Sequence, residues 1–333
     1  MATTVAVLGA GSWGTALDMQ LARMGHDVRL WARDVERAEA MERDRVNQRY
    51  LPDCPFPKSL HVTSDFEAAC RGADRLLVAT PSHAFGETLD RLTPFVTAET
   101  GLAWASKGFE PGTGRLLHEV AGERFGDEIA LALITGPSFV REVAQALPTA
   151  VTVAATDADF GQAWAALLHG KNFRAYYTAD LIGAELGGAI KNVLAVACGL
   201  ADGLGLGHNA RAALITRGLA EMRRLGRALG ADDHTLMGLA GIGDLVLTCT
   251  GDLSRNRRLG LALGQGDSID QAVAEIGQVV EGIKTAEEVM RLAQRAGVEM
   301  PIAEQVHGIL YRGWSPRKGV QVLMERELKP ETE

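Results

Sequence analysis

The chain has 333 residues, of which 47% are hydrophobic and 23% are charged, and its formal net charge is −8. This acidic balance excludes a broad nucleic-acid-binding surface, which would need an excess of lysine and arginine. It still allows a local cluster of cations that binds a small anion. The length is typical of two domains that each bury a core of their own.

The sequence also bears on metal binding, disulfides and export. The four cysteines lie far apart without C-x-x-C spacing, which argues against a zinc site or a disulfide framework. The opening MATTVAVLGAGSWG has no basic region and its apolar run is broken by glycines, so it predicts a buried strand and not a signal peptide. No uninterrupted apolar segment approaches the roughly 18 residues of a membrane span. We expect a soluble, cytoplasmic protein without a metal and without stable membrane insertion.

The first half of the chain alternates short apolar runs with helical patterns. The runs predicted as buried parallel strands are Val5–Leu8, Val28–Trp31, Leu76–Ala79, Leu102–Ala105 and Leu131–Thr135, and the candidates that extend their sheet are Ala150–Ala154 and Arg174–Tyr177. A helix over Thr15–Met24 separates the first two strands and ends at Gly25. This rhythm predicts a doubly wound sheet with right-handed crossovers.

The pattern changes after about Asp180, where helical periodicity replaces strand signals. The expected helices are Leu181–Leu204, Ala210–Leu229, Ser268–Ile276, Thr285–Ala296 and Ile302–Tyr311. We therefore expect an α/β domain over residues 1–185, followed by an all-α domain over residues 186–333.

A glycine-rich segment follows the first predicted strand. Gly9, Gly11 and Gly14 match the pattern G-x-G-x-x-G at the point where a strand ends and a helix begins. In that context the first glycine permits a tight turn, the second lets the backbone approach a pyrophosphate, and the third lets the helix pack closely on the strand. The free N–H groups and partial positive charge of the helix N-terminus favour phosphates. The pattern predicts a Rossmann-like domain that binds NAD(H) or NADP(H).

The end of the second strand bears on the choice of nucleotide. NAD-selective sites usually carry an acidic residue there, which binds the ribose 2′-hydroxyl. Arg33 occupies this region and favours the 2′-phosphate of NADP(H), whereas Asp34 beside it favours NAD(H). A solvated arginine at a strand end is the plainer interpretation. The sequence inclines to NADP(H), with use of both nucleotides left open.

Ligands of open α/β sheets bind beyond the carboxyl ends of the strands. Polar segments follow the third, fourth and fifth predicted strands, and they are Thr80-Pro81-Ser82, Ser106-Lys107-Gly108 and Gly136-Pro137-Ser138. A single lysine at a strand end is often only solvated. Lys107 and Ser138 at neighbouring strand ends are better explained as parts of a substrate site.

The helical half adds a lysine in an apolar setting. Lys191 follows Gly187 and Gly188 at the start of a helix that is apolar almost all round. The glycines would allow this helix to approach the nucleotide-binding domain, so that Lys191 reaches the cleft. A buried ammonium needs a partner or must lose its proton, and either condition suits a catalytic base. The alternative is a lysine that extends to solvent at the helix rim.

Two further polar segments complete the candidate site. Asp244 follows a Gly-Ile-Gly turn and could orient Lys191 or a substrate hydroxyl. The segment Ser254-Arg255-Asn256-Arg257-Arg258 offers a hydroxyl, an amide and guanidinium groups, which suit a phosphate. The alternative is a capped helix with a solvated basic first turn, although cations there oppose the helix dipole.

Together these motifs resemble bacterial-type NAD(P)-dependent glycerol-3-phosphate dehydrogenases over essentially the whole chain. The matching segments are GAGSWGTAL, SKGFEP, GPSF, GAELGGAIKNVLA, DGLGLGHNARAALITRGLAEM, GIGDLVLTC, SRNRRLG and VVEG. One departure concerns the nucleotide: many relatives have W-A-H-R after the second strand, where this chain has Trp31-Ala32-Arg33-Asp34.

The resemblance implies roles for individual residues. It implies that the cofactor is contacted by Ser12, Trp13, Arg33, Tyr50, Lys107, Val140, Arg255, Val279 and Glu281. It implies that the substrate is held by Lys107, Gly136, Ser138, Asp244, Ser254, Arg255 and Asn256, and that Lys191 is the proton acceptor. It further implies a homodimer that acts on a small phosphorylated molecule and supplies glycerophospholipid synthesis.

We expect Lys191, Lys107 and Asp244 to carry the catalysis, with Lys191 as general acid and base. Two alternatives stay open at this point. Another two-domain dehydrogenase, such as a β-hydroxyacid or 6-phosphogluconate dehydrogenase, would also pair a Rossmann-like domain with helices that carry a lysine. A non-catalytic nucleotide sensor would bind NADP(H) tightly without turnover.

Overall fold

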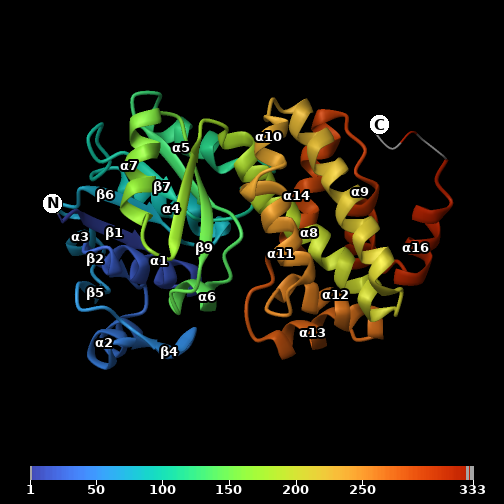
Figure 1. The fold of residues 1–333 in the computed structure, drawn as a ribbon, viewed down its shortest axis with the longest axis horizontal. Coiled ribbons are helices and arrows are strands. Elements are labelled where there is room, and N and C mark those ends of the chain that lie inside the picture. Colours follow the sequence, from blue (N-terminus) through green and yellow to red (C-terminus); the bar gives the residue numbers. More distant parts are fainter. Residues whose placement is uncertain (1, 328–329, 331–333) are drawn as a thin grey trace. The chain divides into compact units, whose positions relative to one another are not determined.

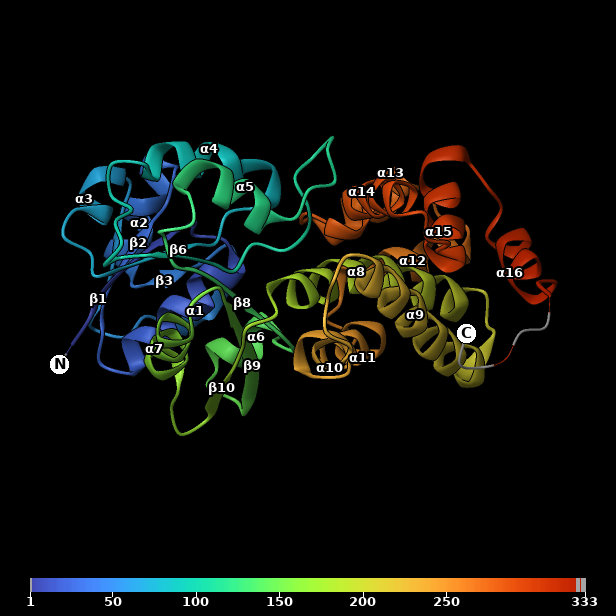
Figure 2. The same cartoon turned by 90° about the horizontal axis from the view of Figure 1, so that it is seen from above.

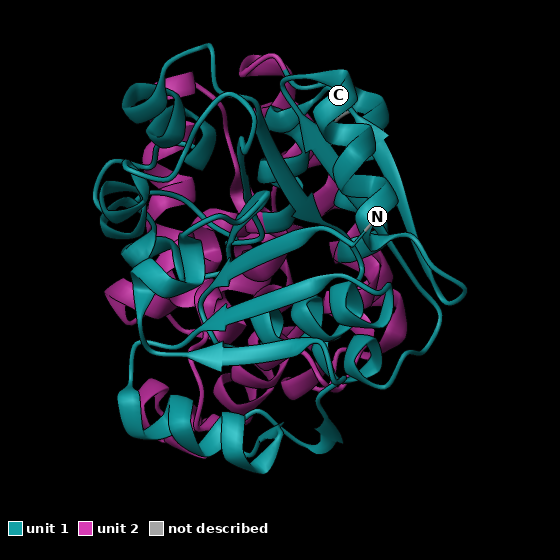
Figure 3. Cartoon of the chain, turned by 90° about the vertical axis from the view of Figure 1, so that its left-hand side faces the viewer, with its two compact units in different colours: residues 1–188, 231–244 teal, residues 189–230, 245–333 magenta. Residues whose placement is uncertain are grey.

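A computed structural model describes residues 2–327 and residue 330 (Figure 1). The chain divides into two units, coloured separately in Figure 3. Unit 1 comprises Met1–Gly188 and Ala231–Asp244, and unit 2 comprises Ala189–Gly230 and Leu245–Glu333. The segment Ala231–Asp244 thus belongs to unit 1 although it lies deep in the helical half of the sequence. The sequence pattern, with its single boundary near residue 185, does not indicate this return.

Unit 1 is built on an eight-stranded sheet with the order β10-β9-β8-β7-β6-β1-β2-β5. Its strands are β1 (Thr4–Leu8), β2 (Asp27–Trp31), β5 (Leu60–Thr63), β6 (Arg75–Val78), β7 (Leu102–Trp104), β8 (Leu131–Thr135), β9 (Thr149–Ala155) and β10 (Phe173–Thr178). All seven predicted strands are present. The short strand β5 was missed, as was a separate two-stranded sheet of β3 (Val46–Asn47) and β4 (Leu51–Pro55).

One pair of neighbouring strands departs from the parallel arrangement. β8 pairs with β9 antiparallel, and the other paired strands of this sheet are parallel. The helix between β8 and β9 is α6 (Val140–Ala144). The chain re-enters the sheet at the end where β8 left it, so this connection is not a crossover.

Helices cover both faces of the sheet (Figure 2). The helices of unit 1 are α1 (Ser12–Arg23), α2 (Val35–Asp44), α3 (Phe66–Cys70), α4 (Ser82–Leu92), α5 (Leu117–Phe125), α6, α7 (Ala158–Leu168) and α10 (Asp233–Leu236), with a π-helical turn η1 at Leu239–Gly243. Alternate residues of β1 face two different cores: Val5 and Val7 pack with α1 and α7, and Ala6 and Leu8 pack with α3, α4 and α5. A sheet covered on both faces explains why its strands are continuous apolar runs.

Unit 2 contains only helices among its described residues. They are the main part of α8 (Leu181–Gly203), then α9 (Gly207–Ala228), α11 (Asp244–Thr250), α12 (Arg255–Gln265), α13 (Ile269–Ile276), α14 (Glu281–Ala296), α15 (Pro301–Arg312) and α16 (Pro316–Met324). With the sheet of unit 1, this confirms the predicted fold class, a Rossmann-like doubly wound sheet followed by an all-α part.

Helix α8 is long and apolar enough to cross a membrane by length and composition, with a mean hydropathy of 1.5 over its best window. Residues 233–250 and 255–265 pass the same test if they are taken as one bent span. The helix was predicted over Leu181–Leu204, and its apolar sequence is interrupted by Glu185, Lys191 and Asn192. However, 94% of the α8 window is buried inside the protein. Such burial by its own chain is what a core helix shows.

Glycines allow α8 and α12 to pack with their backbones almost in contact. A Cβ at Gly199 would lie 2.0 Å from the carbonyl oxygen of Arg257, and one at Gly260 would lie 2.1 Å from that of Val196. At Gly203 and Gly264, one turn further along each helix, a Cβ would lie 2.3 and 2.6 Å from backbone carbonyl oxygens of the other helix. No side chain fits at such distances, so these glycines set the spacing of the two helices.

A buried carboxylate at the start of α15 gives a testable pH dependence. Glu221 of α9 is 3% exposed and accepts hydrogen bonds from the N–H groups of Ile302 (2.6 Å) and Ala303 (3.3 Å). Burial raises the pKa of Glu221 to about 7, against the hydrogen bonds and the charges of Arg224 and Arg326. Because this pKa is higher in the folded than in the unfolded chain, its contribution to stability is full below the unfolded pKa. That contribution is lost as the pH rises through about 7.

We therefore expect Glu221→Gln to weaken the fall in unfolding free energy between about pH 5 and pH 8, by roughly 2 kcal/mol. Glutamine keeps one oxygen, which can accept the shorter hydrogen bond from Ile302, and has no charge to desolvate. Urea unfolding at both pH values measures the effect, with Glu304→Gln, an exposed position on α15, as the control. Equal pH slopes for the wild type and Glu221→Gln would contradict the prediction.

Candidate active site

The loop between β1 and α1 contains three glycines, and the structure shows which of them the fold itself requires. Gly9 has φ +127°, and a Cβ there would lie 2.8 Å from the carbonyl carbon of Ala79. A Cβ at Gly14 would lie 2.0 Å from the carbonyl oxygen of Gly9. Gly11 has an ordinary extended conformation (φ −73°, ψ 178°), and a Cβ there would meet nothing within 4 Å. The protein itself thus needs glycine at two positions, whereas the open space at Gly11, beside the N-terminus of α1, fits a pyrophosphate.

The acidic residue after β2, Asp34, caps the N-terminus of the helix that follows it. Asp34 is the N-cap of α2, and its carboxylate accepts a hydrogen bond of 2.9 Å from the N–H of Arg37. Arg33, its neighbour, is exposed. A carboxylate that caps a helix is less available to a ribose 2′-hydroxyl, so the balance at this strand end moves towards a phosphate.

Lys107 and Asp244 form an ion pair in unit 1, although 137 residues separate them. The distance from Lys107 Nζ to Asp244 Oδ2 is 3.2 Å, and the side chains are 14% and 1% exposed. The ammonium also lies 6.0 Å from the centre of the Trp13 ring, at the start of α1. This pair was not predicted, because the sequence analysis assigned Asp244 to Lys191 or to a substrate hydroxyl. It brings three predicted site residues together beside the glycine loop.

Close packing of glycines places Asp244 there. The π-helical turn η1 leads directly into Asp244, and a Cβ at Gly241 would lie 1.9 Å from the carbonyl oxygen of Leu236. A Cβ at Gly187, in the first turns of α8, would lie 2.2 Å from the carbonyl oxygen of Ala240. Gly188 likewise faces the hydroxyl of Thr135 at the end of β8, with 2.9 Å to a Cβ. The glycines therefore let α8 and η1 pack tightly within unit 1.

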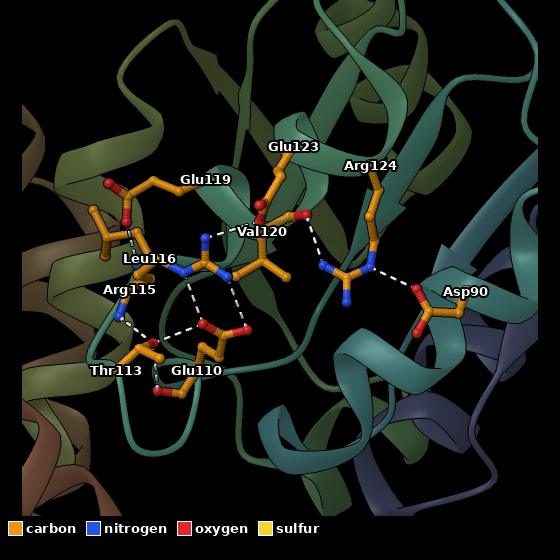
Figure 4. A network of polar contacts seen from close by, with 9 residues as sticks. All are labelled: Asp90, Glu110, Thr113, Arg115, Leu116, Glu119, Val120, Glu123 and Arg124. Carbon is orange, nitrogen blue, oxygen red and sulfur yellow. Dashed lines mark hydrogen bonds and ion pairs between the residues drawn. The ribbon is translucent and has the colours of Figure 1, made fainter.

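The loop that follows Lys107 is closed by an ion pair (Figure 4). Glu110 receives two hydrogen bonds from Arg115, of 2.7 and 3.1 Å, and its backbone N–H donates to the carbonyl of the same arginine at 2.9 Å. Hydrogen bonding to Arg115 lowers the pKa of Glu110. Arg115 also pairs with Glu123 of α5 at 2.8 Å. This bidentate clamp, which the sequence analysis missed, ties the loop to α5.

The segment after β8 has the predicted form of a polar turn. Gly136 has φ +129°, and a Cβ there would lie 3.1 Å from the Cα of Val151, so that glycine is required. The hydroxyl of Ser138 donates a 2.9 Å hydrogen bond to the carbonyl of Gly136. Val140 begins α6 and packs partly buried against the core of α1 and α7.

Unit 2 holds the second group of predicted residues. Lys191 on α8 is 6% exposed, so it is not a solvated lysine at a helix rim. Its neighbour Asn192 accepts a 2.8 Å hydrogen bond from Asn256 and donates one of 3.3 Å to Glu281. Asn256 in turn accepts from the N–H of Gly282 at 2.8 Å. These hydrogen bonds connect α8, α12 and α14 at the residue that follows Lys191. Asn192 was not predicted as a site residue, although a buried amide beside the lysine of an apolar helix was the available signal.

The basic segment at the start of α12 has a mixed role. Ser254 caps the helix by accepting from the N–H of Arg257 at 3.2 Å, as the simpler interpretation of this segment expected. Arg257 pairs with Asp202 at 2.8 Å and is thus engaged within unit 2. Arg255 donates a 2.8 Å hydrogen bond to the carbonyl of Val279, which brings two residues predicted for the cofactor together. Arg255 and Asn256 are the better candidates for a phosphate.

The fold and these two groups of residues define the class: a dinucleotide-binding α/β unit combined with a helical unit that carries a buried lysine. Models of the N-terminus and C-terminus of NAD-dependent glycerol-3-phosphate dehydrogenase match residues 4–161 and 180–321. The chain belongs to this family, as the sequence motifs indicated.

Individual relatives agree with this assignment. The chain is 59% identical over 334 residues to glycerol-3-phosphate dehydrogenase (NAD(P)+) of Stenotrophomonas maltophilia strain R551-3, covering 99% of this chain and 98% of the relative. A crystal structure of glycerol-3-phosphate dehydrogenase from Coxiella burnetii is 48% identical, with a TM-score of 0.94 over 98% of this chain and 99% of that one. A ketopantoate reductase from Ralstonia eutropha, 17% identical, covers 95% of this chain and 99% of its own with a TM-score of 0.60, and shares the fold.

Proposed function

We propose that this protein interconverts sn-glycerol 3-phosphate and dihydroxyacetone phosphate with NADP(H) or NAD(H), in the cytoplasm and as a homodimer, and supplies glycerol 3-phosphate for glycerophospholipid synthesis. The observation that carries the proposal is the buried Lys107–Asp244 pair beside the open glycine loop, in a chain whose two halves both match the family. A nucleotide sensor would have no need of a desolvated ion pair at that place.

The residues of unit 1 are suited to hold the nucleotide. The N-terminus of α1 with Gly11 and Ser12 would bind the pyrophosphate, and Trp13, Tyr50 and Val140 would contact the rest of the cofactor. Arg33 would pair with a 2′-phosphate, which is why we expect NADPH to be preferred over NADH. Arg255, Val279 and Glu281 are further proposed cofactor contacts. The bound nicotinamide supplies the hydride acceptor or donor.

The proton is handled by the protein. In the oxidative direction neutral Lys191 would accept the proton of the C2 hydroxyl, and in the reductive direction its ammonium would return that proton to the ketone oxygen. Lys107, held by Asp244, would position the glycerol together with Gly136 and Ser138. Arg255, Asn256 and Ser254 would bind the phosphate, because a guanidinium retains further N–H donors after one hydrogen bond.

Steady-state kinetics test this function. The purified protein should oxidise NADPH in the presence of dihydroxyacetone phosphate, with a higher kcat/KM than for NADH. It should show little turnover with a β-hydroxyacid or 6-phosphogluconate as the alternative substrate with NADP+. Binding of NADPH without turnover would favour the sensor, and turnover of another substrate would favour one of the other two-domain dehydrogenases.

A further inference from the structure

A buried asparagine braces the glycine loop from a segment that has no role in the proposed chemistry. Asn47 lies in β3 and is 0% exposed. Its amide nitrogen donates to the carbonyl oxygen of Ala10 at 3.3 Å and to the hydroxyl of Thr15 at 2.9 Å. Thr15, also 0% exposed, donates in turn to the carbonyl oxygen of Gly11 at 2.8 Å. Two successive carbonyls of the loop are thus held by side-chain donors that reach them from within the protein.

Arg37 completes the brace. One of its terminal nitrogens donates to the carbonyl oxygen of Ala10 at 2.9 Å and to the side-chain oxygen of Asn47 at 3.2 Å. The Arg37 guanidinium also lies 4.7 Å from the centre of the Tyr50 ring, and that of Arg49 lies 5.4 Å from the same ring. One guanidinium therefore contacts both the glycine loop and the aromatic ring that we propose as a cofactor contact.

The brace determines where the N–H groups of the loop point. In a planar trans peptide the C=O and the N–H of the same unit point in opposite directions. Holding the carbonyl of Ala10 inward therefore turns the N–H of Gly11 outward, and holding that of Gly11 turns the N–H of Ser12 outward. These are among the first N–H groups of α1, which have no acceptor within their own helix. They are the groups that would receive the pyrophosphate.

We propose that Asn47, supported by Arg37 and Thr15, is a positioning residue for the dinucleotide: it orients the Ala10–Gly11 and Gly11–Ser12 peptides and so sets cofactor affinity without taking part in the chemical step. This inference rests on the proposed function only for the identity of the ligand. An asparagine that merely stabilised the turn would affect folding alone.

The test compares Asn47 with a second buried side-chain amide that also donates to a backbone carbonyl. Gln20 lies on α1, is 4% exposed, and donates to the carbonyl of Leu168 at 2.9 Å, at the end of α7. We expect Asn47→Ala to raise the Kd and KM for NADPH roughly tenfold or more with kcat at saturation within about twofold. The Ala10 carbonyl would keep only Arg37, and Arg37 would itself lose its Asn47 partner, so the loop peptide is held less firmly. Gln20→Ala should lower Tm comparably and leave the Kd unchanged. Fluorescence titration with NADPH gives the Kd independently of turnover.

Thr15→Val provides a second route if Asn47→Ala does not fold. It removes the hydroxyl that links Asn47 to Gly11 at nearly constant volume. The Gly11 carbonyl keeps the backbone N–H of Thr15 at 3.0 Å, so we expect a smaller rise in the Kd for NADPH in the same direction. A wild-type Kd in Thr15→Val, or in a folded Asn47→Ala, would overturn the positioning role. Failure of the wild type itself to bind NADPH would instead overturn the proposed function.

Discussion

Lys191→Ala is expected to lower kcat about 10²–10⁴-fold and to leave the Kd for NADPH within about twofold. The proposed proton transfer needs the amine of Lys191, and alanine has no group that can replace it. Lys191 is only 6% exposed on an apolar helix of unit 2, so its amine does not serve to solvate the surface. Removing it leaves the glycine loop and its brace in unit 1 unchanged. Pre-steady-state and steady-state rates in both directions measure the loss.

Two controls separate chemistry from folding. Lys191→Met keeps the approximate length of the side chain but has no group that can accept or donate a proton. It should be as inactive as the alanine variant, and its Tm should be close to that of the wild type. Lys284→Ala, at an exposed position on α14, should retain full activity. An alanine variant with near-normal kcat would refute the assignment of Lys191 as acid and base.

Gly11→Val is expected to raise the Kd for NADPH more than a hundredfold, whereas the fold should lose no more than about 1 kcal/mol, the usual cost of a poor N-cap residue. The backbone at Gly11 is extended, and nothing in the chain lies within 4 Å of a Cβ there. The added side chain therefore fills only the space that we assign to the pyrophosphate. Fluorescence titration and thermal unfolding distinguish the two effects.

Gly14→Ala provides the contrasting variant on the same loop. Its Cβ would lie 2.0 Å from the carbonyl oxygen of Gly9, so it should destabilise the fold itself. If Gly11→Val bound NADPH normally, or unfolded as readily as Gly14→Ala, the open space at Gly11 would not be the nucleotide site.

Elements whose signal lies within a few consecutive residues could be predicted. The strands of the sheet were recognised because both faces are covered, so that every residue of a strand such as Leu131–Thr135 is buried. β3 and β4 were missed because a two-residue strand has no periodicity and Leu51–Pro55 contains two prolines. β5 was missed because its polar residues alternate over only four positions. The antiparallel direction of β9 depends on the end of the sheet at which the chain re-enters, which no strand pattern reveals.

The candidate site divides in the same way. The glycine loop, Lys107 and Lys191 were proposed from local context: a strand end, a helix start, and a charge in an apolar helix. Asn47 and Arg115 were not found, because each acts on a backbone or carboxylate that lies elsewhere in the chain. Asp34 was found, but its capping of α2 became clear only from the hydrogen bond to Arg37.

By itself, the amino-acid sequence determined the class of fold, the dinucleotide loop and the family, because short motifs and hydrophobic periodicity indicate all three. Only the tertiary structure decided which distant groups meet, above all that residues 231–244 return to unit 1 and pair Asp244 with Lys107. A contact across 137 residues depends on chain topology and on glycines small enough for close packing. Neither leaves a periodic trace along the chain.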